Sequence, residues 1–446
     1  ERLTDLTFTV TRASLERAIL GFEHAEALRL QTALDERLAS LEPWHSRALE
    51  AYSRVLTLVP EDSFARGRRL DVLFRLYLAA ERQGRDLMLH TLRQLIRTEE
   101  GGNGTYETLL DPTGKVRIAT DPAGARCRLA RVGSSADHVR REPAEWVDLG
   151  PSPISERVLP RGSWLLEVED DGPDRVVRAP FFLERDEEVR LEVRVPPPGE
   201  GPSGMAFVPD GVFLAGGDPI ALQALSPRRV RLRDFWIDER EVTVAEYARF
   251  LADLGAEAKK HVPKMIDRQG RPVFGTLGTR VEVLEVADHD PSWPVAGIRS
   301  ESAVRYALWR SVREGRTFRL PDELEWEKAA RGADGRSYPW GDGFEARFAN
   351  VVGVDIPDQP AMLSPVGSHP DDRSVYGAFD MAGNVAEWTS SSPGGIFRVV
   401  KGASFLHRGD VGARCASRNY LDVSIAAEEL GFRLVLEPAR EGGSRR

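Results

Sequence analysis

The residues best suited to chemistry lie in the last quarter of this 446-residue chain. Asp380 and Glu387 stand seven residues apart, and Gly383 lies between them. Calcium takes about six to eight oxygen ligands, from carboxylates and from the carbonyls of irregular backbone, so this spacing suits a calcium ion. The alternative is that the two acids only cap and brace loops, and the sequence leaves that choice open.

A cationic segment with one acid follows. Its polar members are His407, Arg408, Asp410, Arg414, Arg418 and Asn419. An arginine fork binds a carboxylate or a phosphate through two parallel hydrogen bonds, so an acidic or phosphorylated peptide is a reasonable ligand. Arg414 is the arginine that we most expect to be a buried brace for the C-terminal strand instead.

Composition excludes several classes of site and partner. The two cysteines, Cys127 and Cys415, lie far apart, which excludes a disulfide framework and a cysteine-rich zinc site. The net charge of −9 gives no reason to expect a nucleic-acid partner. No run of 18 or more apolar residues exists, so we expect no membrane insertion, and no signal peptide is visible. The compartment stays unknown, with the cytoplasm favoured.

The elements that must position these residues begin with a helical region over residues 1–100. Apolar residues recur there at helical spacing, and Pro43 is expected to end the first long helix. Further helices are predicted over about 63–83 and 86–97. The region is similar to a tetratricopeptide helix pair, and the alternative is a helical bundle without a binding groove.

The hydrophobic period changes to two between residues 113 and 196, which predicts strands. The phrase containing the turn Pro122-Ala123-Gly124-Ala125 resembles the PEGA family, whose members are small β-sandwich modules that act as surface or spacer domains. Residues 197–203 are rich in proline and glycine and are expected to form a stiff linker.

Residues 204–438 contain six phrases, in order, that resemble the formylglycine-generating-enzyme (sulfatase-modifying-factor) family. They include FWIDEREVTVAEYARFL, RLPDELEWEKAARG, GAFDMAGNVAEW and KGASF…ARCASRNY…LGFRLVL. The resemblance implies a C-type-lectin-like α+β fold with long loops, so the fold class expected for the whole chain is multidomain α+β. Within this domain, Thr243 and Glu246 predict a helix-capping box, and Pro321 is expected early in a helix whose acids are structural. Residues 439–446 are expected to be a disordered tail.

The resemblance also implies two structural calcium sites. The first consists of the Asp380 side chain, the carbonyls of Gly383 and Val385, and the Glu387 side chain. The second consists of Asn350, the Val351 carbonyl, Asp358 and the Pro360 carbonyl.

The family's enzymes oxidise a substrate cysteine to formylglycine with a copper ion held by two thiolates, the soft ligands that select copper(I). Their positions fall on Asp410 and on Phe405, or on Leu406 if one gap is allowed. Cys415 matches a neighbouring cysteine that is not a ligand. We therefore expect no copper and no formylglycine activity. The family's groove recognises a peptide, and the cationic segment would line it.

The order of the regions is similar to the C-terminal part of certain bacterial serine/threonine protein kinases. The chain has no kinase motifs, and it begins at Glu1 rather than at a methionine. A kinase domain is therefore expected upstream of Glu1. The function predicted is a non-catalytic regulatory region that binds a peptide or protein. The alternatives are an oxidoreductase of the same family with a changed metal centre, and a variable binding protein of a diversity-generating retroelement.

Overall fold

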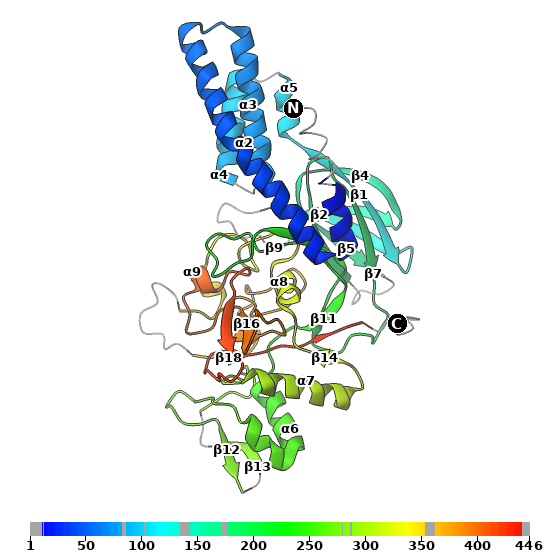
Figure 1. The fold of residues 1–446 in the computed structure, drawn as a ribbon. Coiled ribbons are helices and arrows are strands. Elements are labelled where there is room, and N and C mark those ends of the chain that lie inside the picture. Colours follow the sequence, from blue (N-terminus) through cyan, green and yellow to red (C-terminus); the bar gives the residue numbers. More distant parts are fainter. Residues whose placement is uncertain are drawn as a thin grey trace. The chain divides into compact units, whose positions relative to one another are not determined.

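The computed structural model describes residues 11, 13–82, 86–101, 104–133, 143, 145–170, 176–278, 280–285, 288–352 and 362–438 (Figure 1). It combines helices with several sheets, which confirms the mixed α and β composition. Two compact units are present. The first comprises Glu1–Val116, Arg157–Arg161 and Leu183–Val189, and the second comprises Arg117–Glu156, Gly162–Phe182 and Arg190–Arg446.

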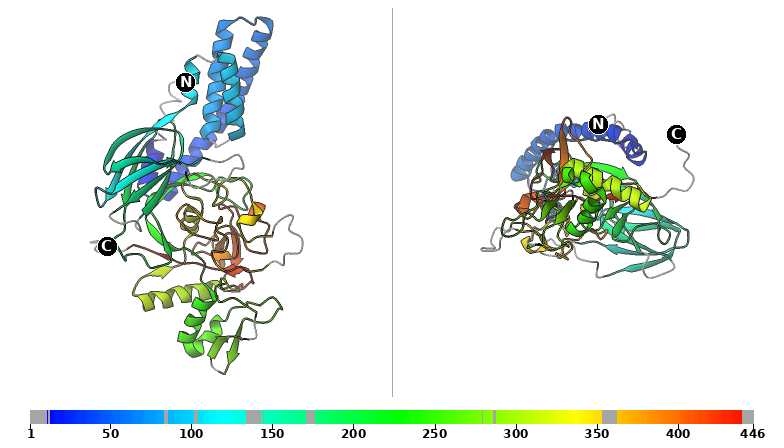
Figure 2. Two further views of the ribbon diagram at one scale, coloured as in Figure 1. Left: turned by 180° about the vertical axis from the view of Figure 1, so that it is seen from behind. Right: turned by 90° about the horizontal axis from the view of Figure 1, so that it is seen from below.

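Helices make up most of the first unit. They are α2 (His24–Leu58), α3 (Ser63–Arg82), α4 (Asp86–Glu100) and α5 (Thr105–Leu110). The first three lie side by side in both Figure 1 and Figure 2. Their core includes Leu73, Tyr77, Ile96 and Leu110, all buried. The predicted helices over 63–83 and 86–97 are confirmed. No helix in the described part of the chain has both the length and the apolar character needed to cross a bilayer.

Pro43 does not end a helix, so that prediction was wrong. It lies inside α2, which continues on both sides of it. Proline in a helix removes one hydrogen bond and clashes with an earlier carbonyl, at a cost of about 3 kcal/mol. Leu34 before it is buried, and Leu49 after it packs against the helical core. Burial of apolar side chains on both sides of the proline offsets its local cost.

Seven strands follow the helices in sequence, in two sheets. One has the order β4-β1-β7, formed by β1 (Thr113–Asp121), β4 (Ile154–Pro160) and β7 (Glu188–Arg194). The other has the order β3-β2-β5-β6, formed by β2 (Arg126–Arg131), β3 (Val147–Pro151), β5 (Gly162–Glu169) and β6 (Val176–Leu183). Burial alternates along β1 and β6, as the period of two predicts. The PEGA and tetratricopeptide resemblances stay predictions.

The rest of the second unit carries short sheets joined by long loops. Its strands are β8 (Met205–Val208), β9 (Gly211–Ala215), β10 (Arg228–Leu232), β11 (Phe235–Asp238), β12 (Phe274–Leu277), β13 (Arg280–Val283), β14 (Phe318–Arg319), β15 (Ala386–Trp388), β16 (Phe397–Lys401), β17 (Asn419–Asp422), β18 (Leu430–Gly431) and β19 (Val435–Leu436). They form two pairs, β10-β9 and β12-β13, and two four-stranded sheets, β14-β19-β11-β8 and β17-β16-β15-β18. Its helices are α6 (Val244–Leu254), η1 (Gly255–His261), α7 (Ser300–Glu314), α8 (Glu323–Arg331), η2 (Ala346–Phe348) and α9 (Gly409–Gly412).

Two of these helices begin with capping boxes. Thr243 and Glu246 form the one predicted for α6, with the Thr243 amide donating to the Glu246 carboxylate at 2.8 Å. In α8 the N-cap is Asp322, and Glu325 completes the box. Pro321 therefore precedes the helix instead of lying within it, because the Asp322 side chain already accepts the first free amides.

Two large apolar clusters and a smaller one around Tyr338 and Trp340 fill the described residues of this part of the unit. The larger is built on aromatic rings, with Tyr247, Phe250, Tyr306 and Phe432 in mutual contact. The second lies between α8 and the strands β8 to β11 and includes Trp326, Ala329 and Ala330. These clusters hold the loops that carry the candidate site.

Candidate functional site

A buried arginine lies at the centre of the candidate calcium region. Arg433 connects β18 to β19 and is fully buried. Its guanidinium donates to both Glu387 carboxylate oxygens at 2.8–2.9 Å and to the carbonyls of Asp238 at 3.2 Å and Phe379 at 2.9 Å. Trp326 Nε1 also donates to Glu387, at 3.0 Å. The charge of Glu387, a predicted calcium ligand, is therefore neutralised within the protein.

Three further carboxyls, Glu241, Asp372 and Asp380, form what we call the carboxylate cluster; all three are buried. Asp380 has a φ of 56°, a backbone conformation that short polar residues tolerate, and its carboxylate accepts from the Gly367 amide at 2.5 Å. Asp372 accepts from the Ala382 amide at 3.0–3.1 Å. Burial raises the pKa of Glu241 and of Asp372 well above the ordinary range, and the neighbouring Asp380 raises both further.

Glu241 is the exceptional member of this cluster. It is 2% exposed, and neither of its carboxylate oxygens accepts from an N–H or O–H donor of the described structure; the group near it is the Asp380 carboxyl, with which it can share a proton. A buried carboxylate without a partner is costly unless a cation or a proton neutralises it. Asp380 and Glu241 therefore supply buried carboxylate oxygens of the kind that calcium takes, whereas the Gly383 and Val385 carbonyls stay predicted ligands. Within the described residues, no three His, Cys, Asp or Glu side chains converge as a metal site, so backbone oxygens would have to complete it.

The second predicted calcium site is only partly described. The Asn350 side-chain amide donates to the Met362 carbonyl at 2.8 Å and to the Asn384 side chain at 3.0 Å. The Val351 amide donates to the Ala349 carbonyl at 3.0 Å. Asp358 and Pro360 lie outside the described residues, so the geometry of this site stays a prediction.

The segment that would carry copper is called here the RC loop, residues 405–415. Phe405 is buried, whereas Leu406 is exposed. Asp410 lies in α9, where its carbonyl accepts from Tyr338 Oη at 2.8 Å and from Arg414 Nε at 2.9 Å. No thiol occupies any of the three positions.

Cys415, at the end of the RC loop, is fully buried, and burial raises the pKa of its thiol to about 12. Its carbonyl accepts from Lys401 Nζ at 2.8 Å. A buried, protonated thiol is neither a nucleophile nor a ready metal ligand. The RC loop therefore offers no pair of thiolates.

Two arginines of the cationic segment are committed to the fold. Arg414 pairs with Asp218 at 2.7 Å and lies over the Tyr338 ring. Arg418 pairs with Glu323 at 2.5 Å and is 9% exposed. Both are structural contacts, so neither guanidinium is available as a fork for an external anion.

The remaining members of the segment reach the surface. Arg408 has a side chain that is 68% exposed and forms an ion pair with Asp410 at 3.3 Å. His407 is half-buried, with Nδ1 bonded to Ser404 Oγ at 2.7 Å, and Asn419 is exposed at the start of β17. The accessible part of the predicted groove therefore consists of Arg408, Asp410, Asn419 and the half-buried His407.

Comparison with known proteins decides the family. Residues 194–438 match the family described as sulfatase-modifying factor enzyme 1-like domain. The chain belongs to this family. Residues 194–438 are called the sulfatase-modifying-factor domain below.

Two relatives and one solved structure place this match in context. The serine/threonine-protein kinase Pkn1 of Chlamydia trachomatis serovar L2 is 26% identical over 387 residues, which cover 80% of this chain and 59% of that protein. The chain thus spans about six tenths of that kinase. The inactive C-alpha-formylglycine-generating enzyme 2 of Mus musculus is 32% identical over 283 residues, covering 53% of this chain and 86% of that protein. PvdO from Pseudomonas aeruginosa is 24% identical, with a TM-score of 0.41, covering 52% of this chain and 94% of that structure.

Sequence reasoning missed Glu241 and Arg433. Glu241 stands between the strand β11 and the cap of α6, where an acid resembles an ordinary turn residue. Arg433 was visible as a lone charge in the apolar run LGFRLVL, a pattern that indicates a buried and paired cation. Its partner, Glu387, could not be named because 46 residues separate the two.

Proposed function

We propose that this chain is a non-catalytic regulatory region of a bacterial serine/threonine kinase-type protein, in which the sulfatase-modifying-factor domain is the binding module. The observation that carries the proposal is the RC loop. The family resemblance puts Asp410 and Phe405, or Leu406 if one gap is allowed, at the positions of the two copper thiolates, and Cys415 is buried and protonated. A carboxylate and an apolar side chain do not make a copper(I) site.

The relatives support both halves of the proposal. One is named an inactive formylglycine-generating enzyme and resembles this chain at 32% identity. The kinase Pkn1 aligns with 80% of the chain, which is more than the sulfatase-modifying-factor domain occupies, so part of the helical or β region also has a counterpart there. Two kinases named Pkn1 from other Chlamydia species match as well, at 28% identity.

The binding face that we propose is the exposed part of the cationic segment. Arg408 presents a guanidinium at the surface with Asp410 beside it, and Asn419 adds an amide. Arginine binds carboxylates and phosphates through paired hydrogen bonds, so the ligand class is an acidic or phosphorylated peptide. Arg414 and Arg418 contribute indirectly by fixing the loop.

A structural calcium ion belongs to the same proposal. The Asp380 and Glu241 carboxylates would hold it, and its charge would satisfy the two Glu241 oxygens that accept from no N–H or O–H donor of the described structure. The ion would fix the loop of residues 367–385. The Phe405 amide donates to the Asn384 carbonyl of this loop at 3.0 Å. Calcium therefore acts on stability and takes no part in chemistry.

The binding test uses fluorescence anisotropy with a labelled glutamate-rich peptide, its phosphoserine counterpart and a lysine-rich peptide. We expect the first or second to bind and the third not to bind. The double variant Arg408→Ala/Asp410→Ala should weaken binding by about tenfold or more, the effect of losing one charge-assisted contact. Equal affinity in the wild type and the double variant would show that the exposed part of the cationic segment does not bind the peptide.

A matched control separates this effect from a general loss of charge. Arg347 and Glu345 form a surface pair at 3.1 Å with the same spacing of two residues. The double variant Arg347→Ala/Glu345→Ala should bind as the wild type does. If both double variants lose affinity equally, or only together with a lower melting temperature, the cationic segment is not the contact surface.

A further inference from the structure

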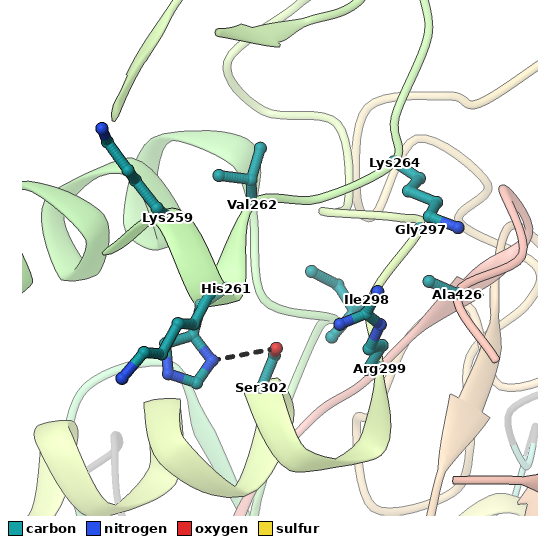
Figure 3. Close-up of a pocket in the computed structure, with 10 residues that line it drawn as sticks. Lys259, His261, Val262, Lys264, Gly297, Ile298, Arg299, Ser302 and Ala426 are labelled. Atoms are coloured by element: carbon teal, nitrogen blue, oxygen red, sulfur yellow. Dashed lines mark hydrogen bonds between the residues drawn. The ribbon is translucent and has the colours of Figure 1, made fainter. Parts of the chain in front are cut away.

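A small pocket with a cationic lining lies where η1 ends and α7 begins (Figure 3). Its volume is about 70 Å³. Four cationic side chains line it, from Lys259, Lys260, Lys264 and Arg299. None of them belongs to the cationic segment, the RC loop or the carboxylate cluster. We call this site the basic pocket.

Most of this positive charge is not neutralised by the protein. Lys260 pairs with Glu257 at 2.7 Å. Among the described residues, Lys259, Lys264 and Arg299 have no carboxylate within 4.0 Å, and all three are exposed. Figure 3 shows the end of Lys259 directed away from Arg299 and Lys264. Arg299 and Lys264, which are drawn apart from Lys259, are therefore the two cations that we test together.

The remaining polar lining is fixed in place. His261 is 8% exposed, and its Nδ1 lies 3.0 Å from Ser302 Oγ, the contact drawn in Figure 3. Burial lowers the pKa of His261, and the nearby Arg305 also lowers it, whereas Glu301 acts in the opposite direction. The imidazole is therefore neutral near pH 7, and the charge of the pocket comes from lysine and arginine.

The start of α7 adds to the same field. Arg299 is the N-cap of this 15-residue helix, and no side chain caps the helix. Its carbonyl accepts from the amides of Ser302 and Ala303, at 3.0 and 3.2 Å, and Arg299 and Ser302 are the residues of this helix start that line the pocket. The positive end of the helix dipole at this point favours an anion. Glu301 in the first turn and Glu257, the partner of Lys260, are acids near the pocket that oppose it.

We propose that the basic pocket binds a phosphoryl group, either free phosphate or a phosphate ester. Two cations without partners and a helix N-terminus suit a dianion better than a single carboxylate, and a pocket of this volume suits a compact tetrahedral group. Arg299 supplies two parallel donors and Lys264 a point charge, which is how proteins divide phosphate binding between these residues. The site goes beyond the proposed function, because it uses none of the peptide-binding residues.

The test is isothermal titration calorimetry on the full chain at pH 7.5 and constant ionic strength. Inorganic phosphate, O-phosphoserine and sulfate are titrated in separate arms. We expect saturable binding of one phosphate or phosphoserine per chain, and weakening by at least about tenfold in Arg299→Ala/Lys264→Ala. Tighter binding of phosphoserine than of phosphate identifies an ester as the source, and equal or weaker binding identifies the free ion.

Two controls keep the result specific. Arg280→Ala removes an exposed arginine of β13 that does not line the pocket, and it should bind phosphate as the wild type does. Arg408→Ala/Asp410→Ala, which tests the proposed function, should also leave phosphate binding unchanged. The single variants Lys264→Gln and Arg299→Gln replace the double variant if its melting temperature falls. Absence of saturable phosphate and phosphoserine binding, or equal affinity in wild type and pocket variants, overturns the proposal.

Discussion

Two buried carboxylates of one phrase, Glu387 and Asp380, have opposite electrostatic surroundings. Glu387 is held by the Arg433 guanidinium and by Trp326, so its charge is neutralised inside the protein. Asp380 lies beside Glu241, another carboxylate, whose two oxygens accept from no N–H or O–H donor of the described structure. The first site is complete as the chain folds, whereas the second needs a cation or protons from solution. The same phrase therefore supplies one internal brace and the carboxylate at which we propose a calcium ion.

The largest expected effect comes from breaking the ion pair between Glu387 and Arg433. Arg433→Met removes the guanidinium and leaves Glu387 buried without a counter-charge. Breaking a buried ion pair in this way costs about 3–5 kcal/mol, so the free energy of unfolding should fall by about that amount in urea denaturation. The control Arg347→Met, at an exposed ion pair, should change it by less than about 1 kcal/mol. A loss below about 1 kcal/mol in Arg433→Met would mean that this pair is not the brace described.

The second expected effect concerns the incomplete site. Calcium should raise the melting temperature of the wild type, because an ion that binds only the folded state stabilises it by mass action. Glu241→Gln should remove most of that increase, and Glu387→Ala should also remove it by destroying the Arg433 brace. In chelator, Glu241→Gln should melt at or above the wild type, since it relieves the unpaired buried charge. Identical wild-type melting curves in calcium and in chelator would contradict calcium binding. They would mean that protons alone neutralise the carboxylate cluster.

The third test concerns Lys328, a buried lysine without a carboxylate partner, instead of a buried carboxylate. Lys328 is fully buried, Nζ donates to the carbonyls of Pro209 at 2.7 Å and Gly211 at 3.1 Å, and burial lowers the pKa of this lysine to about 7. Between pH 7 and 10 the unfolded chain therefore binds more protons at this lysine than the folded chain does. Stability contributed by Lys328 should rise with pH across this window, by at most about 1.4 kcal/mol per pH unit.

The measurement compares urea unfolding of the wild type and Lys328→Met at several pH values from 7 to 10. The unfolding free energy of the wild type should increase relative to that of Lys328→Met as pH rises. Lys401, which is equally buried but paired with Glu327 at 3.2 Å, is the contrasting case of a neutralised cation. A pH-independent difference would show that Lys328 is charged or neutral to the same extent in both states.

The sequence predicts those parts of the structure that local interactions decide. The capping box of Thr243 and Glu246 and the helices α3 and α4 follow from neighbouring residues, and the structure confirms them. Pro43 misled the prediction because its local cost is offset by apolar packing along α2, which sequence periodicity does not measure. The start of α8 was misplaced because Asp322, rather than Pro321, satisfies the first amides.

The candidate site was predictable only in part, for the same reason. Asp380 and Glu387 could be named from one phrase, but their electrostatic difference depends on Glu241 and Arg433, which approach from distant segments. The absence of thiols at positions 405, 406 and 410 could be read directly from the sequence. That Arg414 and Arg418 are committed to Asp218 and Glu323 required the fold, because their partners lie 196 and 95 residues away.

We propose that this domain keeps the family's frame without its redox chemistry, and one measurement tests this proposal most directly. The purified full chain is loaded with copper(I), washed with a chelator, and incubated with a Cys-x-Pro-x-Arg peptide under oxygen. We expect no stoichiometric copper by metal analysis and no formylglycine by mass spectrometry, because Asp410 and Phe405 or Leu406 replace the thiolates. Retained stoichiometric copper together with a formylglycine product would contradict the account and establish an oxidoreductase with a changed metal centre.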